Sequence, residues 1–152
     1  MSKKFNPSEY SLRLIDKEFA CFEEDSQPKS KIRYYIDEEK QTVVAVMDDC
    51  EYDAIDVLQK MGIRNISYDG YNMNKFMMNP TYRGKAKCSP EDEWDEEYGM
   101  TLARNRMLEN YYRSRAIALM KAETVLQNIL DEIGSRIDYA DYRCSKAYSG
   151  EL

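Results

Sequence analysis

Hydrophobic residues recur every three or four positions in two segments of the first half of the chain. Residues 8–24 and residues 50–61 both show this spacing, which places the apolar side chains on one face of a helix. In the first segment they are Leu12, Ile15, Phe19 and Phe22. The second segment ends at Gly62, a residue that readily adopts the left-handed conformation that closes a helix, and Asp48 with Glu51 fits a capping box at its start.

The longest helical pattern begins near residue 95 and runs to residue 133. Its apolar stripe consists of Ala103, Met107, Tyr111, Ala118, Ala122, Val125, Ile129 and Ile133. Gly134 is the expected end, and residues 136–148 are expected to form a last short helix. A helix over residues 95–133 would be about 58 Å long, which exceeds the width of a small domain. We therefore expect it either to break near residues 112–114 or to leave the sheet in its second half.

Strand patterns precede and follow the second helix. Residues 31–36 and 42–47 are rich in β-branched and aromatic side chains, and the turn-like residues between them predict an antiparallel hairpin. The second of these strands is apolar without alternation, which indicates that both of its faces are covered. Residues 63–68 fit a further strand. Residues 69–80 mix turn formers with large apolar groups, as is typical of an exposed, adaptable loop or of an irregular edge segment.

Residues 81–88 alternate between cations and small or apolar side chains. As a strand, this segment shows three cations on one face, namely Arg83, Lys85 and Lys87. Ser89 and Asp92 then fit the start of a helical turn, and Asp95 fits the cap of the long helix. Trp94 lies between the two starts, where it can pin this joint to the core.

These elements predict an α+β fold in which a small, curled antiparallel sheet packs against helices and a long helix closes the chain. We divide the chain into an N-terminal helix and linker over residues 1–30, a core domain over residues 31–112 and a C-terminal helical extension over residues 113–152. The extension is expected to pack on the core, on the N-terminal helix or on a second copy of the chain. A chain of 152 residues is long enough for one compact domain of this kind.

The composition disfavours catalysis and metal binding. The chain has no histidine for general-base work, no glycine-rich phosphate loop and no nucleophile elbow. Its four cysteines are scattered without a C-x-x-C pair, so local zinc motifs cannot be assembled and free thiols are expected. We therefore expect no enzyme activity, no catalytic residue, no metal and no cofactor.

The charge balance and the absence of an apolar run bear on location and partners. No stretch approaches the ~18 apolar residues of a membrane span, so we expect a cytoplasmic protein without a membrane partner. The 28 acidic residues outnumber the 22 basic ones, which gives a net charge of −6. This balance disfavours non-specific binding of nucleic acid and permits binding to a basic partner. Thirteen tyrosines supply side chains that suit protein interfaces.

Residues 84–107, GKAKCSPEDEWDEEYGMTLARNRM, resemble a recurrent module in small proteins of phages and mobile elements. The positions that match this module are Gly84, Ala86, Cys88, Pro90, Asp92, Trp94, Asp95, Gly99, Leu102, Ala103 and Arg106. The resemblance implies a fold like that of the double-stranded RNA-binding domain and an origin in a phage or prophage of a Gram-positive bacterium. It would place the protein in the cytoplasm of an infected or lysogenic host, and it transfers no catalytic residue.

Clustered carboxylates lead to the first functional hypothesis. A folded surface of closely spaced acids can imitate the phosphates of a nucleic acid and occupy the basic channel of a nuclease. Together with the resemblance to phage proteins, this predicts an anti-CRISPR type of protein, a non-enzymatic inhibitor of a host defence nuclease or its ribonucleoprotein complex. The residues expected to bind the partner are Asp37, Glu38, Glu39, Asp48, Asp49, Glu51, Asp53, Glu91, Glu93, Glu96 and Glu97.

Two alternatives stay open. A nucleic-acid-binding accessory or regulatory protein would use a basic face, with tyrosines for base stacking. The cations of that face would be Arg83, Lys85, Lys87, Arg104, Arg106, Arg113 and Arg115. A structural or assembly protein would instead form a homodimer through the long C-terminal helix. A simpler interpretation also stays open, in which these charged side chains have no partner to bind and only keep the exposed faces of the helices and strands hydrated.

Overall fold

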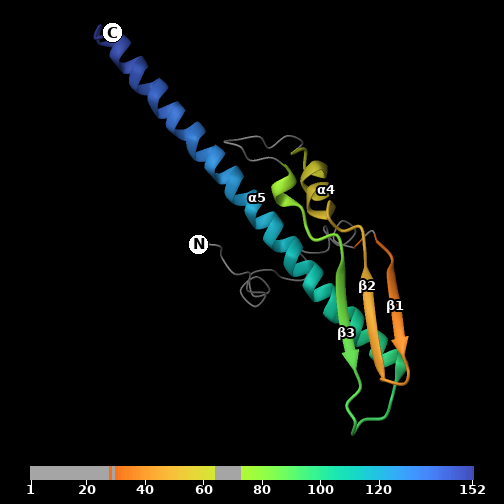
Figure 1. Cartoon of the computed structure of the whole chain (residues 1–152). Helices are drawn as coiled ribbons and strands as arrows, with labels where there is room; N and C mark the ends of the chain where they lie inside the picture. The colour runs from red at the N-terminus through yellow and green to blue at the C-terminus, as the bar shows by residue number, and fades with distance from the viewer. Residues whose placement is uncertain (1–27, 29, 64–72) are drawn as a thin grey trace.

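The computed structural model describes residue 28 and residues 30–63 and 73–152 of the chain. Its elements in chain order are β1 (Ile32–Asp37), β2 (Thr42–Met47), α4 (Asp53–Lys60), the 3-10 helix η2 (Met73–Phe76), β3 (Tyr82–Lys87) and α5 (Glu96–Tyr148). They form the expected α+β fold, a three-stranded antiparallel sheet with a long C-terminal helix (Figure 1). The helix expected over residues 8–24 and nearly all of the strand expected over residues 63–68 lie outside the described residues.

β2 is the central strand of the sheet, and it pairs with β1 on one side and β3 on the other. The predicted hairpin is confirmed, with Ile32 opposite Met47 and Asp37 opposite Thr42. Five of the six residues of β2 are buried, which agrees with its uninterrupted apolar sequence. β3 alternates strictly between buried and exposed residues, as its sequence pattern predicts.

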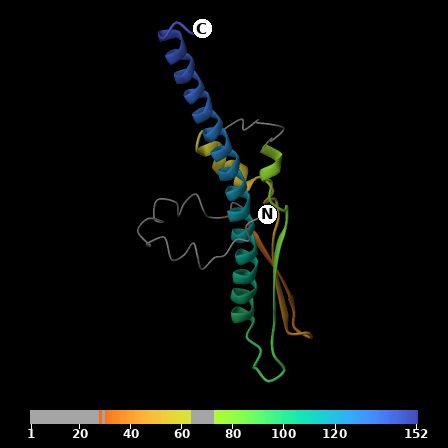
Figure 2. The same ribbon diagram turned by 90° about the vertical axis from the view of Figure 1, so that its left-hand side faces the viewer.

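The main core lies between the sheet and the first half of α5. Figure 2 shows the helix on one face of the sheet, so the other face stays uncovered by helices in the described part of the chain. The buried side chains include Val43, Ala45 and Met47 of β2, Tyr82 and Ala86 of β3, and Ala103, Met107 and Tyr111 of α5. A Cβ atom on Gly84 would lie 2.1 Å from the carbonyl oxygen of Ala103 and 2.4 Å from the amide nitrogen of Met107. Only glycine at this position lets the helix backbone approach β3 so closely.

A second core joins α4 and η2 to the middle of α5. Its buried side chains are Ile55, Leu58, Phe76, Ala122 and Val125. In the described part of the loop expected over residues 69–80, Phe76 and Met78 are buried, so the prediction of an exposed loop is wrong at these two positions, whereas Met77 is 40% exposed as expected. Large apolar side chains in an irregular segment can be buried when they pack against a neighbouring helix. Here η2 packs against α5.

The start of α4 differs from its prediction, whereas its end agrees with it. The helix begins at Asp53 after Tyr52, which makes no side-chain capping bond, so the predicted capping box is wrong. The Asp48 carboxylate instead accepts a hydrogen bond from Thr81 Oγ1 at 3.0 Å and pairs with Arg33. At the other end Gly62 has φ of +84°, the left-handed conformation expected of a helix stop.

α5 is one continuous helix of 53 residues, about 80 Å long at the usual rise per residue. Asp95 caps it as predicted, because its carboxylate accepts a hydrogen bond from the Tyr98 amide at 3.0 Å. The helix neither breaks near residues 112–114 nor ends at Gly134, and the separate short helix expected over residues 136–148 is wrong. A glycine inside a helix costs only about 1 kcal/mol relative to alanine, so Gly134 alone does not stop it.

The second half of α5 leaves the sheet, which confirms the other alternative. The last buried residue of the helix is Val125, and no residue from 130 to 148 is buried. Figures 1 and 2 both show this part projecting beyond α4 and η2. We call residues 130–148 the free segment of α5. Among the described residues, no helix is long and apolar enough to cross a membrane.

Candidate protein-interaction site

The strand register brings two acidic segments together at one end of the sheet. β1 ends and β2 begins at the turn over residues 37–41, and β3 ends opposite that turn, with Lys87 facing Thr42. The Cys88 amide donates a hydrogen bond to the Gln41 carbonyl oxygen at 2.9 Å, so the turn and residues 88–97 lie side by side where α5 starts (Figure 1). We call these two segments the acidic end. Apart from Lys40 their charged residues are all acids, namely Asp37, Glu38, Glu39, Glu91, Asp92, Glu93, Asp95, Glu96 and Glu97.

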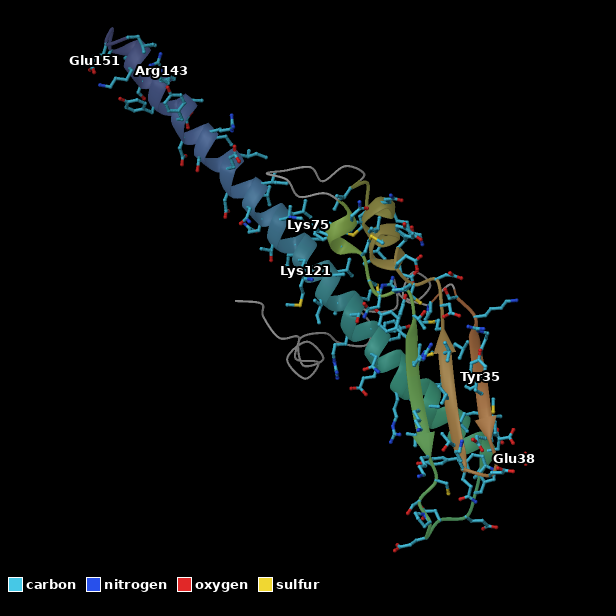
Figure 3. All side chains as sticks on the ribbon, viewed as in Figure 1. Tyr35, Glu38, Lys75, Lys121, Arg143 and Glu151 are labelled. Atoms are coloured by element: carbon cyan, nitrogen blue, oxygen red, sulfur yellow. The ribbon has the colours of Figure 1, made fainter. Side chains whose placement is uncertain are left out.

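Two of these carboxylates have local structural roles. Asp37 accepts a hydrogen bond from the Lys40 amide at 3.0 Å and pairs with its ammonium at 3.2 Å, and these contacts lower the pKa of Asp37. Asp95 caps α5. Within the described part of the chain, no hydrogen bond or ion pair engages the exposed carboxylates of Glu38, Glu39, Glu91, Glu93, Glu96 and Glu97. All six residues are exposed, and Figure 3 shows Glu38 at the tip of the hairpin.

A pocket of about 300 Å³ opens between the end of β3 and the first turn of α5. Two aromatic side chains line it: Trp94, which is half-buried and packs against the main core, and Tyr98, which is exposed. The carboxylate-bearing residues Asp92, Glu93 and Asp95 also line it, and they outnumber its one basic residue, Lys87. Aromatic rings beside carboxylates suit the apolar stem and the cationic head of an arginine or lysine side chain.

Four of the predicted partner-binding acids lie at the opposite end of the sheet, one strand length or about 20 Å away. They are Asp48, Asp49, Glu51 and Asp53, which follow β2 and enter α4. Asp48 joins β1 to the segment before β3 through Arg33 and Thr81. Glu51 is half-buried, and its Oε2 atom has no hydrogen-bond partner among the described residues. The structure therefore does not bring these four residues to the acidic end.

Asp53 takes part in a buried polar contact between α4 and α5. The Tyr111 hydroxyl donates a hydrogen bond to Asp53 Oδ2 and accepts one from Arg115 Nη1 at 3.3 Å. Burial raises the pKa of Tyr111, and the hydrogen bond to Asp53 raises it further. Arg115, which was predicted on a basic surface, is 8% exposed and belongs to this internal contact.

The three cations of β3 lie on the uncovered face of the sheet, and β1 contributes a fourth that the sequence interpretation missed. The register places Arg33 and Arg83 on either side of Val46, and Tyr35 and Lys85 on either side of Val44. Tyr35 is 54% exposed, and Figure 3 shows it on β1. We call the set of Arg33, Tyr35, Arg83, Lys85 and Lys87 the basic sheet face. The signal for Arg33 was the alternation of apolar and polar residues in β1.

The predicted cations of α5 do not join the basic sheet face. Arg106 Nη1 donates to the Lys85 carbonyl oxygen at 2.6 Å, along the outer edge of β3, and Asn110 Nδ2 donates to the Arg83 carbonyl oxygen at 3.4 Å. Arg113 forms an ion pair with Glu109 one turn earlier, at 2.6 Å. Arg104 is exposed on the helix. The seven predicted cations are thus divided between the sheet face, the sheet edge, the helix surface and the core.

No group of three acidic or cysteine side chains in the described ranges is arranged to hold a metal ion. Comparison of the chain with protein-family models, with curated proteins and with solved structures gives no match. The function therefore has to be inferred from the chemistry of the two charged surfaces.

Proposed function

We propose that this protein is a non-enzymatic inhibitor of a bacterial defence nuclease, with a CRISPR effector as the favoured partner. It acts by placing the acidic end in the groove where the nuclease holds nucleic acid. The single observation that supports this most is the meeting of two acidic segments, distant in sequence, at one exposed end of the sheet.

Electrostatics explains why such a surface suits a basic partner. Carboxylates held close together repel one another, and cations of a partner relieve that repulsion. Complementary charge also accelerates association at low salt and fixes the orientation of the two proteins. The acidic end thereby competes with the phosphates of a nucleic acid for the same cations.

The pocket at the acidic end supplies a specific anchor. An arginine of the partner inserts between Trp94 and Tyr98, with its guanidinium beside the carboxylates of the pocket. Buried arginine and aromatic contacts of this kind contribute most of the binding energy in many protein interfaces. The surrounding carboxylates attract the basic surface of the partner and repel acidic proteins.

The test is inhibition of a nuclease panel by the wild-type chain and by the double variant Glu91→Gln with Glu93→Gln. Both side chains are exposed and unpaired in the described part of the chain, so the fold stays intact. A matched control, Glu123→Gln with Asp138→Asn, removes the same charge from exposed positions of α5. We expect the half-inhibitory concentration to rise about tenfold or more for the first variant and to stay unchanged for the control.

The proposal fails if the wild-type chain leaves every nuclease of the panel active at molar excess and a pull-down from a nuclease-bearing host recovers no defence protein. Equal loss of inhibition in the Glu91/Glu93 variant and in the matched control would also contradict it. In that case only total charge would matter, and the acidic end would have no special role.

A second candidate function is nucleic-acid binding through the basic sheet face. The observation that favours it is the set of four cations around an exposed tyrosine, on a sheet face that no helix covers among the described residues. Mobility-shift assays at low and moderate salt test it. Retention of duplex or guide RNA that is lost in the Arg83→Glu, Lys85→Glu variant, but kept in Lys121→Glu on α5, would favour this function over inhibition.

A further inference from the structure

The free segment of α5 carries an apolar stripe whose spacing alternates between three and four residues. Its members are Leu130, Ile133, Ile137, Ala140, Cys144 and Ala147, and we call them the seam. All six side chains are exposed, with Leu130 at 60% and Ile137 at 56%. This spacing is the heptad pattern of a coiled coil, in which the stripe packs against another helix.

The free segment has little to stabilise it as a lone helix. Its charged contacts include an ion pair between Arg136 and Glu132 at 2.8 Å and a pair between Lys146 and Glu151, and the rings of Tyr139 and Tyr142 lie 6.4 Å apart. Each such pair contributes only about 0.2–0.5 kcal/mol. Helices of this length draw most of their stability from the packing of an apolar face. A projecting helix with an apolar stripe therefore gains stability when a second helix covers that stripe.

We propose that the seam binds the seam of a second copy of this chain, in a parallel and in-register coiled coil. Leu130, Ile137 and Cys144 take the first apolar position of each heptad, and Ile133, Ala140 and Ala147 take the second. The small residues near the C-terminus let the two backbones approach closely. This inference is independent of the function proposed for the acidic end.

Charges beside the seam select the second copy and the parallel orientation. In a parallel pair, Arg136 lies next to Asp141 of the second copy, and this attraction occurs twice because the two helices are related by symmetry. In an antiparallel pair with the fullest overlap of the seam, Arg136 would instead lie next to Arg143 of the second copy, again twice. Like charges at those positions disfavour the antiparallel arrangement.

The position of the seam in the molecule permits this contact. The last side chain of α5 that packs on the second core is Ile129, and the seam begins at the next residue. Figure 3 shows the segment near Arg143 and Glu151 extending away from the folded body. A second helix can therefore lie along the seam beyond α4 and η2.

The first test measures the mass of the full chain by sedimentation equilibrium over a range of concentrations. We expect a concentration-dependent dimer, and we expect Ile137→Asp to raise its dissociation constant by roughly a hundredfold or more, because it buries an unpaired charge in each helix. Tyr139→Asp introduces the same charge two residues away, outside the seam, and serves as the matched control. It should change the dissociation constant only slightly.

The second test determines orientation and register. In a parallel, in-register pair Cys144 faces Cys144 of the second copy, so mild oxidation of a Cys21→Ser, Cys88→Ser variant should give a covalent dimer. Moving the thiol off the seam, by Cys144→Ser with Ser145→Cys, should slow the crosslink strongly. Arg136→Asp alone should weaken the dimer about tenfold, and Arg136→Asp together with Asp141→Arg should restore it.

A full chain that stays monomeric at all concentrations overturns the proposal, as does a dimer that Ile137→Asp leaves intact. A dimer without the Cys144 crosslink, or one that the charge swap fails to restore, overturns the parallel arrangement. Glu132→Gln controls for the pair between Glu132 and Arg136 within one helix, and it should leave the dissociation constant unchanged.

Discussion

The two halves of α5 are parts of one helix in two different surroundings. Up to residue 129 the helix packs against the sheet, α4 and η2, and its apolar stripe from Ala103 to Ile129 is buried or half-buried. From residue 130 to residue 148 the apolar positions recur with the same periodicity, yet they are exposed. An amphipathic pattern therefore predicts that a face is covered, but it does not identify the segment that covers it. Four substitutions and one alkylation measurement test how different the two halves are.

The largest effect is expected at Gly84, beneath the packed half. Gly84→Ala places a methyl group within 2.4 Å of two backbone atoms of α5, so the helix must move away from β3. We expect a loss of about 3 kcal/mol or more in the free energy of unfolding, measured by urea denaturation. A loss below about 1 kcal/mol would show that the helix lies less closely on β3 than described.

Truncation of one large side chain in each half gives the next largest contrast. Met107 is fully buried in the main core, and Met107→Ala should cost about 2–5 kcal/mol because a cavity remains. Tyr139 is 62% exposed on the free segment, and Tyr139→Ala should change the free energy of unfolding by less than about 0.5 kcal/mol. Comparable losses in both variants, by the same denaturation assay, would contradict the contrast.

The reactivity of the cysteine thiols should also differ between the main core, which contains Cys50, and the free segment, which contains Cys144. Burial raises the pKa of Cys50 in the main core from 9.0 to about 11, and nearby Asp53 adds to the shift. Folding therefore favours the neutral thiol, so this stabilisation is complete below pH 9 and is lost as the pH rises toward 11. Near neutral pH the thiolate is about a hundredfold scarcer than for an ordinary cysteine.

Alkylation followed by peptide mass spectrometry measures this difference between the thiols. Cys50 should react far more slowly than Cys144, which is exposed on the free segment. The Cys50 rate should increase as the pH approaches 11. Equal rates for the two cysteines at pH 8 would show that the core opens readily around Cys50.

A small effect of the opposite sign is expected at Gly134. A Cβ atom there meets nothing within 4 Å, and the residue lies inside the helix. Gly134→Ala should therefore increase helix stability by about 0.5–1 kcal/mol, measured as a higher midpoint in thermal unfolding followed by circular dichroism. The same substitution thus destabilises the packed half at its contact with Gly84 and stabilises the free segment. A decrease at Gly134 would indicate a close neighbour.

Local patterns in the sequence predict much of the fold. The alternation around Lys85 predicts the two faces of β3, and Asp95 identifies the start of α5, because both depend on residues close together in the chain. Predictions that depend on distant partners fail. Asp48 resembles a helix cap, but its carboxylate binds Arg33 and Thr81, which belong to other parts of the sequence. Gly134 resembles a helix end, but its cost is too small to interrupt α5.

The surfaces were predictable only in part, for the same reason. The acids of residues 37–39 and 91–97 are evident in the sequence, but their meeting at one end depends on the register of three strands. Arg115 looks like a surface cation and is buried against Tyr111, because α4 happens to place Asp53 near that hydroxyl. Pairings of this kind are properties of the tertiary fold, and no local pattern encodes them.

The side chains of α5 that bind the edge of β3 also limit how copies of this protein can assemble. An edge strand offers unpaired carbonyl groups on which another chain can add a strand, the first step toward open-ended aggregation. Arg106 and Asn110 occupy the carbonyl groups of Lys85 and Arg83 at this edge. These contacts compete with strand addition on the β3 side, and they disfavour growth of the sheet at that edge.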